Sequence, residues 1–195
     1  MGDQADGLLS PFLRRRRFHA ARRYLRGRVL DFGCGVGELA RIVAAPDYVG
    51  VDVDAESLDL ARGRFPQHRF LAPGDLPGEE RFDTVVALAV VEHAQDPAGL
   101  VARLAGALAP AGRLVLTTPH PVFEPVHDVA ARLRLASRDA NEDHEALLRI
   151  SELEGACTAA GLEAVAARRF LAGMNQLVVA QRPAGADAAE RLGNT

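Results

Sequence analysis

The sequence contains no lysine, so all 23 of its basic residues are arginines. It has only two cysteines, Cys34 and Cys157, and Cys34 lies in a glycine-rich stretch where a disulfide bridge would disturb the turn, so we expect two free thiols. No apolar run approaches the roughly 20 residues that cross a bilayer, and charges stand where a signal peptide would place its apolar stretch. From these absences we expect a cytoplasmic protein with no membrane partner.

The chain also lacks an excess of positive charge, since its formal net charge is −3 and its isoelectric point is about 6.1. The chain as a whole therefore lacks the positive field that non-specific binding to nucleic acid requires, and we expect no nucleic-acid partner. One segment departs from this balance, because residues 14–28 hold eight arginines. That segment is either a solvated helix face or a contact for a phosphate or an acidic substrate.

The chain has 195 residues, of which 48% are hydrophobic and 25% charged, as is typical of one soluble globular domain. Short apolar stretches typical of strands alternate with helical patterns. We expect helices at residues 12–26, 38–45, 55–64, 97–108 and 150–160, and strands at residues 28–32, 48–53, 68–71, 82–88, 113–118, 163–170 and 175–182. Such alternation favours an α/β fold whose parallel sheet is covered by helices on both faces.

The end of the chain departs from the alternating pattern. Its last two expected strands are separated only by a short turn around Ala172-Gly173, and so short a link demands an antiparallel hairpin. Residues 183–195 have too little apolar content to pack, so we expect a mobile tail. These patterns divide the chain into an N-terminal helical cap (residues 1–27), a single α/β domain (residues 28–182) and the tail.

The stretch VLDFGCGVGELA, residues 29–40, leads from a β-prone segment through three glycines into helix-forming residues. In an open parallel sheet, ligands bind beyond the carboxyl ends of the strands, and a glycine turn after the first strand lets backbone N–H groups approach them. Asp52, at the end of the next strand, is placed to hold ribose hydroxyls. Residues 35–40 also fit the dinucleotide pattern G-x-G-x-x-A, so these features predict a cofactor with ribose but leave its identity open.

Further stretches narrow this choice. In order along the chain they are VLDFGCGVG, VGVDVD, PGDLP, FDTVVALAVVEHAQDP and GRLVLTTPHP. Together they closely resemble the class I S-adenosylmethionine-dependent methyltransferases, and most nearly the small-molecule branch that includes the ubiquinone O-methyltransferases. The likeness is continuous over residues 28–121 and weaker to about residue 182. It implies a three-layer, doubly wound α/β fold with a mostly parallel seven-stranded sheet in the order 3-2-1-4-5-7-6, strand 7 antiparallel, and S-adenosylmethionine as cofactor.

The resemblance also implies roles for individual residues. The acidic-plus-glycine motif at residues 31–37 faces the methionine part of the cofactor, the carboxylate of Asp52 accepts the ribose hydroxyls, Asp75 bonds the adenine amine, and Leu88 lies near the cofactor's amino group. The expected cofactor-binding residues are Asp31, Gly33, Cys34, Gly35, Gly37, Asp52, Val53, Asp75, Leu76, Ala87 and Leu88. Asp75 has a second interpretation, as a turn residue after Pro73-Gly74.

Four histidines are candidates for a general base or for contacts to the methyl acceptor: His93, His120, His127 and His144. We expect His93 and His144 to be catalytic, because His93 follows the fourth core strand and His144 matches a late histidine of the branch that the chain resembles. A packed, hydrogen-bonded side chain is an equal alternative for His93. His120, between two prolines, is more simply a stiff turn residue, and surface exposure without a role is the simpler interpretation of His127 and His144.

In the ubiquinone branch the stretch around His93 reads E-x-x-E-H and is associated with a divalent metal. Here Ala89 occupies the first glutamate position, and the loss of one carboxylate weakens a site for a hard cation, so we expect no metal. The same branch recognises its acceptor through the N-terminal helix and the segment after the fifth core strand. Phe12, Phe18, Phe123 and the arginine run are therefore expected to help close the pocket.

The sequence thus predicts a methyltransferase that uses S-adenosylmethionine to methylate a small molecule at oxygen, as a monomer or a homodimer. Alternatives are an N- or C-methyltransferase, a protein that binds the cofactor without turnover, and a nicotinamide-dependent reductase on the same fold. Against the reductase, a chain without lysine has no Tyr-x-x-x-Lys motif. Against methylation of base amines, the motif Asn/Asp-Pro-Pro-Tyr/Phe is missing after the fourth core strand.

Overall fold

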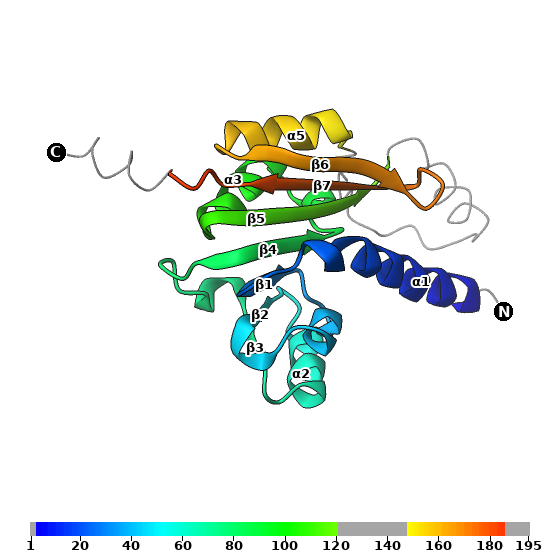
Figure 1. Ribbon diagram of the computed structural model, residues 1–195. Helices are drawn as coiled ribbons and strands as arrows, with labels where there is room; N and C mark the ends of the chain where they lie inside the picture. The colour runs from blue at the N-terminus through cyan, green and yellow to red at the C-terminus, as the bar shows by residue number, and fades with distance from the viewer. Residues whose placement is uncertain (1–2, 121–147, 186–195) are drawn as a thin grey trace.

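The computed structural model describes residues 3–120 and 148–185, with the backbone alone for residues 3–11. Its centre is a seven-stranded sheet in the order β3-β2-β1-β4-β5-β7-β6 (Figure 1). Strands β1 to β5 are parallel to their neighbours in that group, whereas β7 runs antiparallel to both β5 and β6. The strand order and the single reversed strand confirm the doubly wound α/β fold predicted from the sequence.

The strands form where the chain is apolar over several consecutive residues. Their bounds are β1 Val29–Phe32, β2 Tyr48–Val51, β3 Arg69–Leu71, β4 Phe82–Leu88, β5 Leu108–Pro119, β6 Glu163–Phe170 and β7 Asn175–Gln181. All four residues of β2 are buried and so are most of β4, as expected of central strands that are covered on both faces. At the edge of the sheet, β6 has no fully buried residue.

Helices cover the sheet on both faces and give the molecule three layers. α1 (Asp3–Ala21) and α2 (Ala55–Arg64) lie on one face, and α3 (Pro97–Gly106) and α5 (Ile150–Ala159) lie on the other (Figure 1). Each face has its own apolar core: Ala20, Ala21, Leu58 and Ala61 join the first, and Leu100, Leu104, Leu153 and Cys157 join the second. Burial of these side chains against the sheet is the main force that fixes the helices.

Two aspartates cap the helices that follow β2 and β4. The Asp54 carboxylate accepts hydrogen bonds from the backbone N–H groups of Glu56 and Ser57, both at 3.3 Å, and thereby starts α2. The Asp96 carboxylate accepts one from the Gly99 N–H at 2.9 Å and starts α3. Both helices begin where the sequence predicts them, because a short acidic side chain just before a helical pattern satisfies the first free N–H groups.

The α-helix expected at residues 38–45 is wrong. Only a 3₁₀ helix at Glu38–Arg41 forms there, and Ile42 leaves the helical region with φ −125°. Two features of the sequence explain the early end. Ile42 is β-branched and loses side-chain freedom in a helix, and Pro46 has no backbone N–H to donate to the Ile42 carbonyl and instead lies in a separate 3₁₀ turn at Ala45–Asp47.

Two further boundaries also differ from the prediction. α1 begins at Asp3 rather than at residue 12 and passes through Pro11, where the lack of a backbone N–H removes one hydrogen bond without ending the helix. β5 begins at Leu108 rather than at residue 113, because residues 109–112, whose proline and glycine are typical of a turn, form an irregularity inside the strand. There Ala111 has φ 58° and the pairing with β4 shifts register.

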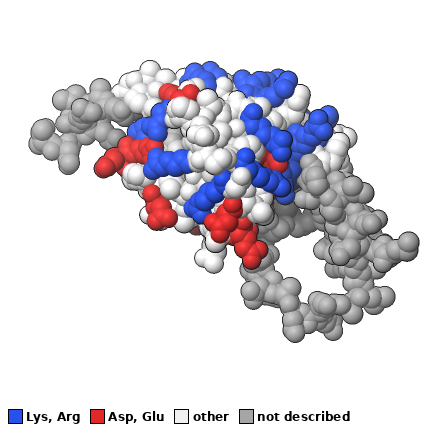
Figure 2. Space-filling model, turned by 90° about the horizontal axis from the view of Figure 1, so that it is seen from below, with Lys and Arg blue, Asp and Glu red and all other residues white. Residues whose placement is uncertain are grey.

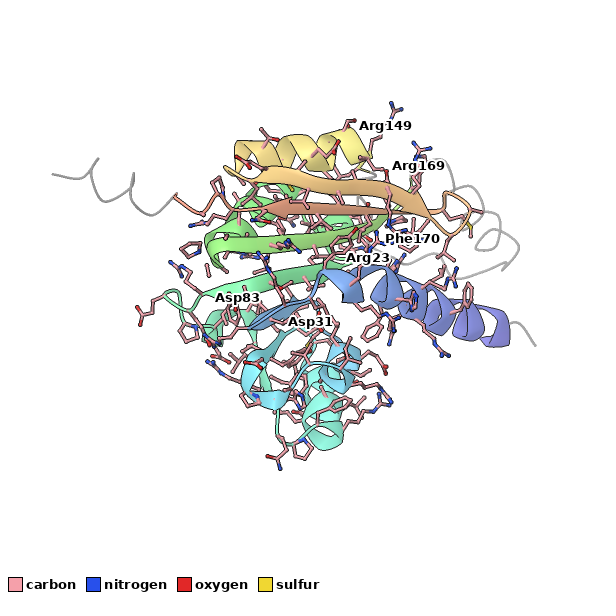
Figure 3. The ribbon with its side chains drawn as sticks, viewed as in Figure 1. Arg23, Asp31, Asp83, Arg149, Arg169 and Phe170 are labelled. Carbon is pink, nitrogen blue, oxygen red and sulfur yellow. The ribbon has the colours of Figure 1, made fainter. Side chains whose placement is uncertain are left out.

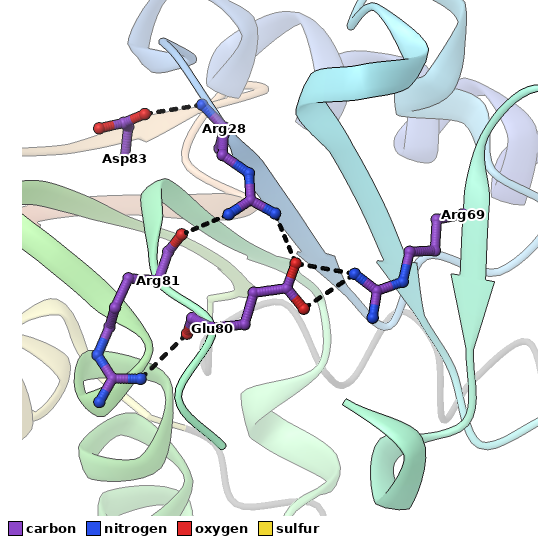
Figure 4. Close-up of polar contacts among 5 residues, drawn as sticks. All are labelled: Arg28, Arg69, Glu80, Arg81 and Asp83. Atoms are coloured by element: carbon purple, nitrogen blue, oxygen red, sulfur yellow. Dashed lines mark hydrogen bonds and ion pairs between the residues drawn. The ribbon is translucent and has the colours of Figure 1, made fainter. Parts of the chain in front are cut away.

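The connection between β3 and β4 contains only a 3₁₀ turn at Pro73–Asp75 and is held by charged side chains instead of a helix. Glu80 accepts hydrogen bonds from Arg28 at 2.5 Å and from Arg69 at 2.8 and 3.0 Å (Figure 4). The backbone N–H of Arg28 in turn donates to Asp83 at 2.8 Å. These bonds fasten the connection at the amino ends of β1, β3 and β4, and leave the carboxyl ends of the strands to form the site.

Arginine supplies all the positive charge of the surface, and Figure 2 shows it beside acidic side chains on the same face. Within the described residues, no helix is both long and apolar enough to span a bilayer. Residues 186–195 of the expected tail lie outside the described part of the chain. The mobility of that tail and the domain boundaries at residues 27 and 182 therefore stay predictions.

Candidate functional site

The turn after β1 has glycine at three positions of left-handed backbone. Gly33, Gly35 and Gly37 have φ values of 77°, 51° and 77°. A Cβ on Gly33 would lie 2.3 Å from Cγ2 of Val90, and one on Gly37 would lie 2.9 Å from the Phe70 ring, whereas one on Gly35 would meet no atom within 4 Å. The protein's own packing therefore requires Gly33 and Gly37, and Gly35 borders open space.

Asp52 ties this turn to the end of β2. One carboxylate oxygen accepts a hydrogen bond from the Gly35 N–H at 2.7 Å, and the other accepts one from the Asp54 N–H at 3.0 Å. Each oxygen has a second lone pair, so the carboxylate can still accept two hydrogen bonds from a ligand. The next side chain, Val53, is 85% exposed and offers an apolar surface beside that carboxylate.

Asp31 lies beneath the turn in the central strand β1 (Figure 3). It is only 4% exposed, and its Oδ2 accepts a hydrogen bond from the Tyr48 hydroxyl at 2.8 Å. Burial raises the pKa of Asp31 to about 7; the Tyr48 bond opposes the shift, and the negative charge of Asp52 adds to it. A cation bound next to Asp31 would favour the ionised form, so this carboxyl is suited to receive an ammonium group.

A cavity of about 460 Å³ opens between the glycine turn and α1. It is lined by Arg14, Arg17, Phe18, Asp31, Gly33, Cys34, Gly35, Val36, Glu38, Leu39, Ser57, Leu88, Ala89 and His93. Of the residues predicted to bind the cofactor, the structure brings Asp31, Gly33, Cys34, Gly35 and Leu88 together here, with the expected catalytic residue His93. The volume suits a ligand of drug-like size.

The wall opposite the glycine turn comes from α1. Arg14, Arg17 and Phe18 line the cavity, as three residues at positions i, i+3 and i+4 on one helix face do. Phe12 does not line it: this side chain is 51% exposed, and the Arg16 guanidinium lies 5.9 Å from the centre of its ring. The cavity therefore has carboxylates on the sheet side and guanidinium groups on the helix side, an arrangement that fits a zwitterionic ligand resembling an amino acid.

Other predicted cofactor residues lie outside this cavity. Gly37 and Ala87 are buried in the protein's own packing. Asp75 is exposed in the 3₁₀ turn after β3, while Leu76 lines a second hollow of about 410 Å³ together with Phe32. Asp52 and Val53 do not line the cavity either, but the Gly35–Asp52 hydrogen bond places that carboxylate at its rim.

The two described histidines among the four candidates differ in their surroundings. His93 is exposed and lines the cavity. His120 is buried, does not line the cavity, and donates its backbone N–H to the Met174 carbonyl at 2.8 Å. Burial lowers the pKa of the His120 imidazole, and the positive charges of Arg169 and Arg149 lower it further. His127 and the expected catalytic residue His144 lie outside the described residues, as does Phe123.

Both cysteines are free thiols, as expected from the sequence, and the structure shows both to be buried. Burial raises the pKa of Cys34, and the negative charge of Asp31 adds to that shift, so Cys34 is a poor nucleophile although it lines the cavity. Over the described ranges, no group of three or more His, Cys, Asp or Glu side chains lies close enough together to hold a metal ion.

Several residues of the site have no distinctive signal in the sequence. Ser57 lines the cavity because α2 begins at the carboxyl edge of the sheet, which a helix boundary alone indicates only roughly. Asn175 contacts the cavity residue Arg17 across 158 positions of sequence, through a hydrogen bond of 2.7 Å from Nε of Arg17 to Oδ1 of Asn175. No local pattern predicts such a contact, because it exists only once β7 has paired with β5.

Comparison with known proteins agrees with this geometry. A family model described as a methyltransferase domain matches residues 4–167 of the chain. Trans-aconitate 2-methyltransferase from Methylobacterium radiotolerans is 38% identical over 104 residues, which cover 50% of this chain and 40% of that protein. Ubiquinone biosynthesis O-methyltransferase from Aromatoleum aromaticum is 31% identical over 150 residues, which cover 70% of this chain and 64% of that protein. The chain thus spans less than two thirds of the length of these relatives.

A solved structure with the same fold is the S-adenosylmethionine-dependent methyltransferase from Mesorhizobium loti, with a TM-score of 0.66. The superposition covers 85% of this chain and 97% of the other. Because only 19% of the sequence is identical, this likeness concerns the fold and not the substrate.

Proposed function

Because the chain belongs to the class I S-adenosylmethionine-dependent methyltransferases, we propose that it transfers the methyl group of S-adenosylmethionine to a small-molecule acceptor, at an oxygen atom. One relative is named as an O-methyltransferase of ubiquinone biosynthesis, and another is named as a methyltransferase of trans-aconitate. Both acceptors are small molecules. This supports the acceptor class but not the identity of the acceptor.

One observation carries the proposal: the Gly35 N–H holds the Asp52 carboxylate at the rim of the cavity, at 2.7 Å. A ribose needs two acceptors side by side for its vicinal hydroxyls, and both oxygens of Asp52 keep a free lone pair for them. The exposed Val53 beside it provides an apolar surface for the adenine ring. The open space at Gly35 leaves room for the chain that joins the ribose to the amino-acid end.

The charges around the cavity suit the amino-acid end of the same cofactor. Asp31 lies under the glycine turn and would pair with the ammonium group, and Arg14 and Arg17 on the opposite wall would pair with the carboxylate. The cofactor supplies an activated methyl group on a sulfonium, which leaves readily in an in-line displacement. The protein has mainly to hold the acceptor oxygen in line with that methyl group and to exclude water.

We assign the role of general base to His93. It lines the cavity, so its imidazole can reach a ligand there, and imidazole is the side chain that most often accepts a hydroxyl proton in general base catalysis. The second expected base, His144, has no described position, and its catalytic role stays a prediction. An amine or carboxylate acceptor would need no base, which keeps N-methylation as an alternative.

The direct test is transfer of label. The protein is incubated with methyl-labelled S-adenosylmethionine and a cell extract, and the labelled product is identified by mass. Label in a small molecule supports the proposal, and label in RNA or protein contradicts the acceptor class. If the label stays in the cofactor although the protein binds it, a binding protein without turnover is favoured. Binding of a nicotinamide dinucleotide in place of S-adenosylhomocysteine would favour the reductase.

A further inference from the structure

A hydrogen bond between Arg17 and Asn175 connects the N-terminal helix α1 to strand β7 beside the cavity. Arg17 is on α1, and Asn175 is the first residue of β7, paired with Pro119 at the end of β5. Nε of Arg17 donates a hydrogen bond to Oδ1 of Asn175 at 2.7 Å. Asn175 is only 2% exposed, so its amide oxygen is held in fixed surroundings.

Arg17 is half-buried and lines the cavity. Burial lowers the pKa of its guanidinium, the negative charge of Glu92 opposes that shift, and the positive charge of Arg14 adds to it. A guanidinium group is planar, with its five N–H groups in a fixed fork, so a bond that fixes Nε also fixes the plane in which the two terminal nitrogens lie. Asn175 thus restricts the direction in which Arg17 presents its remaining donors.

We propose that Asn175 is a positioning residue for cofactor binding, which aims the Arg17 guanidinium at the carboxylate of the amino-acid end. The inference rests on the proposed function, since it presumes a cofactor that carries this carboxylate. Asn175 does not line the cavity and acts only through Arg17. An arginine on a helix surface loses considerable side-chain entropy when it binds a carboxylate, and a preset guanidinium loses less.

The neighbouring residue, Gln176, has a side-chain amide whose contacts are structural. Gln176 is fully buried; its side-chain N–H groups donate to Leu148 at 2.7 Å and to Pro119 at 3.2 Å, and its oxygen accepts from the Ile150 N–H at 3.0 Å. Successive side chains of a strand point to opposite faces, so Gln176 fastens the start of α5 while Asn175 faces α1. Of these two adjacent amides, Asn175 is the one bonded to a charged cavity residue.

Two ligands separate a positioning role from a structural one. S-adenosylhomocysteine carries the amino-acid end, and 5′-methylthioadenosine has the same adenosine and sulfur without it. Calorimetric titration of the full chain is expected to show that Asn175→Ala lowers the affinity for S-adenosylhomocysteine about tenfold. The affinity for 5′-methylthioadenosine should stay unchanged. Arg17→Ala is expected to have the same selectivity and a larger effect. Adding Asn175→Ala to Arg17→Ala should change nothing further, because Asn175 acts through Arg17.

Arg16→Ala is the matched control, since Arg16 is on the same helix and does not line the cavity; it should leave both affinities unchanged. If Asn175→Ala does not fold, Asn175→Leu keeps the buried volume and gives the same comparison. Equal weakening of both ligands, additive effects in the double variant, or unchanged S-adenosylhomocysteine affinity in folded Asn175→Ala would each overturn the inference and leave the proposed function standing. A wild-type protein that binds neither ligand would overturn the proposed function itself.

Discussion

The backbone N–H of Gly35 lies 2.7 Å from Oδ2 of Asp52, so the turn after β1 and the carboxylate after β2 form one rigid unit. The Asp54 N–H, at 3.0 Å from Oδ1, holds the other side of the same carboxylate. A ligand that bridges the two strands therefore meets an acceptor whose direction is already fixed. Preorganisation of this kind reduces the ordering cost of binding.

Replacement of Asp52 by alanine is expected to weaken the binding of S-adenosylhomocysteine by about 1.5–3 kcal/mol, because charge-assisted hydrogen bonds to the ribose hydroxyls are lost. Calorimetric titration measures the change. Asp54→Ala is the control: it removes the cap of α2, which lowers stability, but keeps the backbone N–H that bonds to Asp52, and it should leave the affinity as it is. A folded Asp52→Ala protein with wild-type affinity would count against a ribose at this carboxylate.

Alanine substitutions distinguish the roles of two turn glycines, Gly33 and Gly35, with the helical Gly63 as the control. Gly35→Ala should fold with a loss of stability of about 1–2 kcal/mol from the left-handed backbone alone, since its Cβ meets no protein atom. It should also weaken cofactor binding, because the added methyl group would occupy space that the cofactor needs. Gly33→Ala should lose more stability, because its Cβ would lie 2.3 Å from Val90. Gly63→Ala, in α2 and in open space, should be neutral or stabilising by up to about 1 kcal/mol. Urea unfolding and calorimetric titration of all three variants test this order.

The raised pKa of Asp31 makes stability depend on pH. The folded pKa is about 7 and the ordinary value is 3.8, so between these values the folded state keeps a proton that the unfolded state has released. The free energy of unfolding should therefore fall as pH rises from about 4 to about 7, and should show no further change from this group above that. Asp31→Asn should flatten this slope in urea titrations, and a variant with the wild-type slope would rule out Asp31 as its source.

The raised pKa of Asp31 also predicts that ligand binding is coupled to the release of a proton. A ligand ammonium beside Asp31 stabilises the ionised carboxylate, so S-adenosylhomocysteine should bind more tightly as pH rises through about 7 and should release protons below it. Calorimetry in buffers with different heats of ionisation measures the released protons. Asp31→Asn should abolish this release. 5′-Methylthioadenosine, which has no ammonium group, should show little release even with the wild-type protein.

Both thiols should resist alkylation in the folded protein. Burial raises the pKa of Cys157 to about 11, so about one thiol in a thousand is ionised at pH 8, and the pKa of Cys34 is also raised. Iodoacetamide should label both cysteines rapidly in guanidinium chloride and neither at a comparable rate in its absence. Fast labelling of Cys34 in the folded protein would show that its thiol is more accessible than its burial implies.

Local patterns were sufficient for most of the fold. The starts of α2 and α3, the apolar runs of the central strands and the short link between β6 and β7 each depend on a few neighbouring residues, and the structure confirms them. The helix expected at residues 38–45 is wrong because helical structure ends at Arg41, before the β-branched Ile42. The start of β5 was missed because a bulge with Ala111 at positive φ resembles a turn in sequence.

The site was predictable where its residues are adjacent in sequence or follow strand ends. The glycine turn, Asp31 and Asp52 belong to that group, and so does His93 after β4. Contacts made by tertiary packing were not. The guanidinium of Arg17 meets Asn175 only because α1 packs beside the amino end of the antiparallel strand β7, which the chain reaches much later. The arginine run indicated charge near the N-terminus but not which member would face the cavity.

A crystal structure of the protein with S-adenosylhomocysteine tests the central claim most directly. In that structure we expect the ribose hydroxyls on the Asp52 carboxylate, the ammonium group beside Asp31, and the homocysteine chain across the open space at Gly35. Adenosine bound elsewhere, such as in the hollow lined by Phe32 and Leu76, would contradict it. A nicotinamide dinucleotide in the cavity under conditions where S-adenosylhomocysteine does not bind would do so as well.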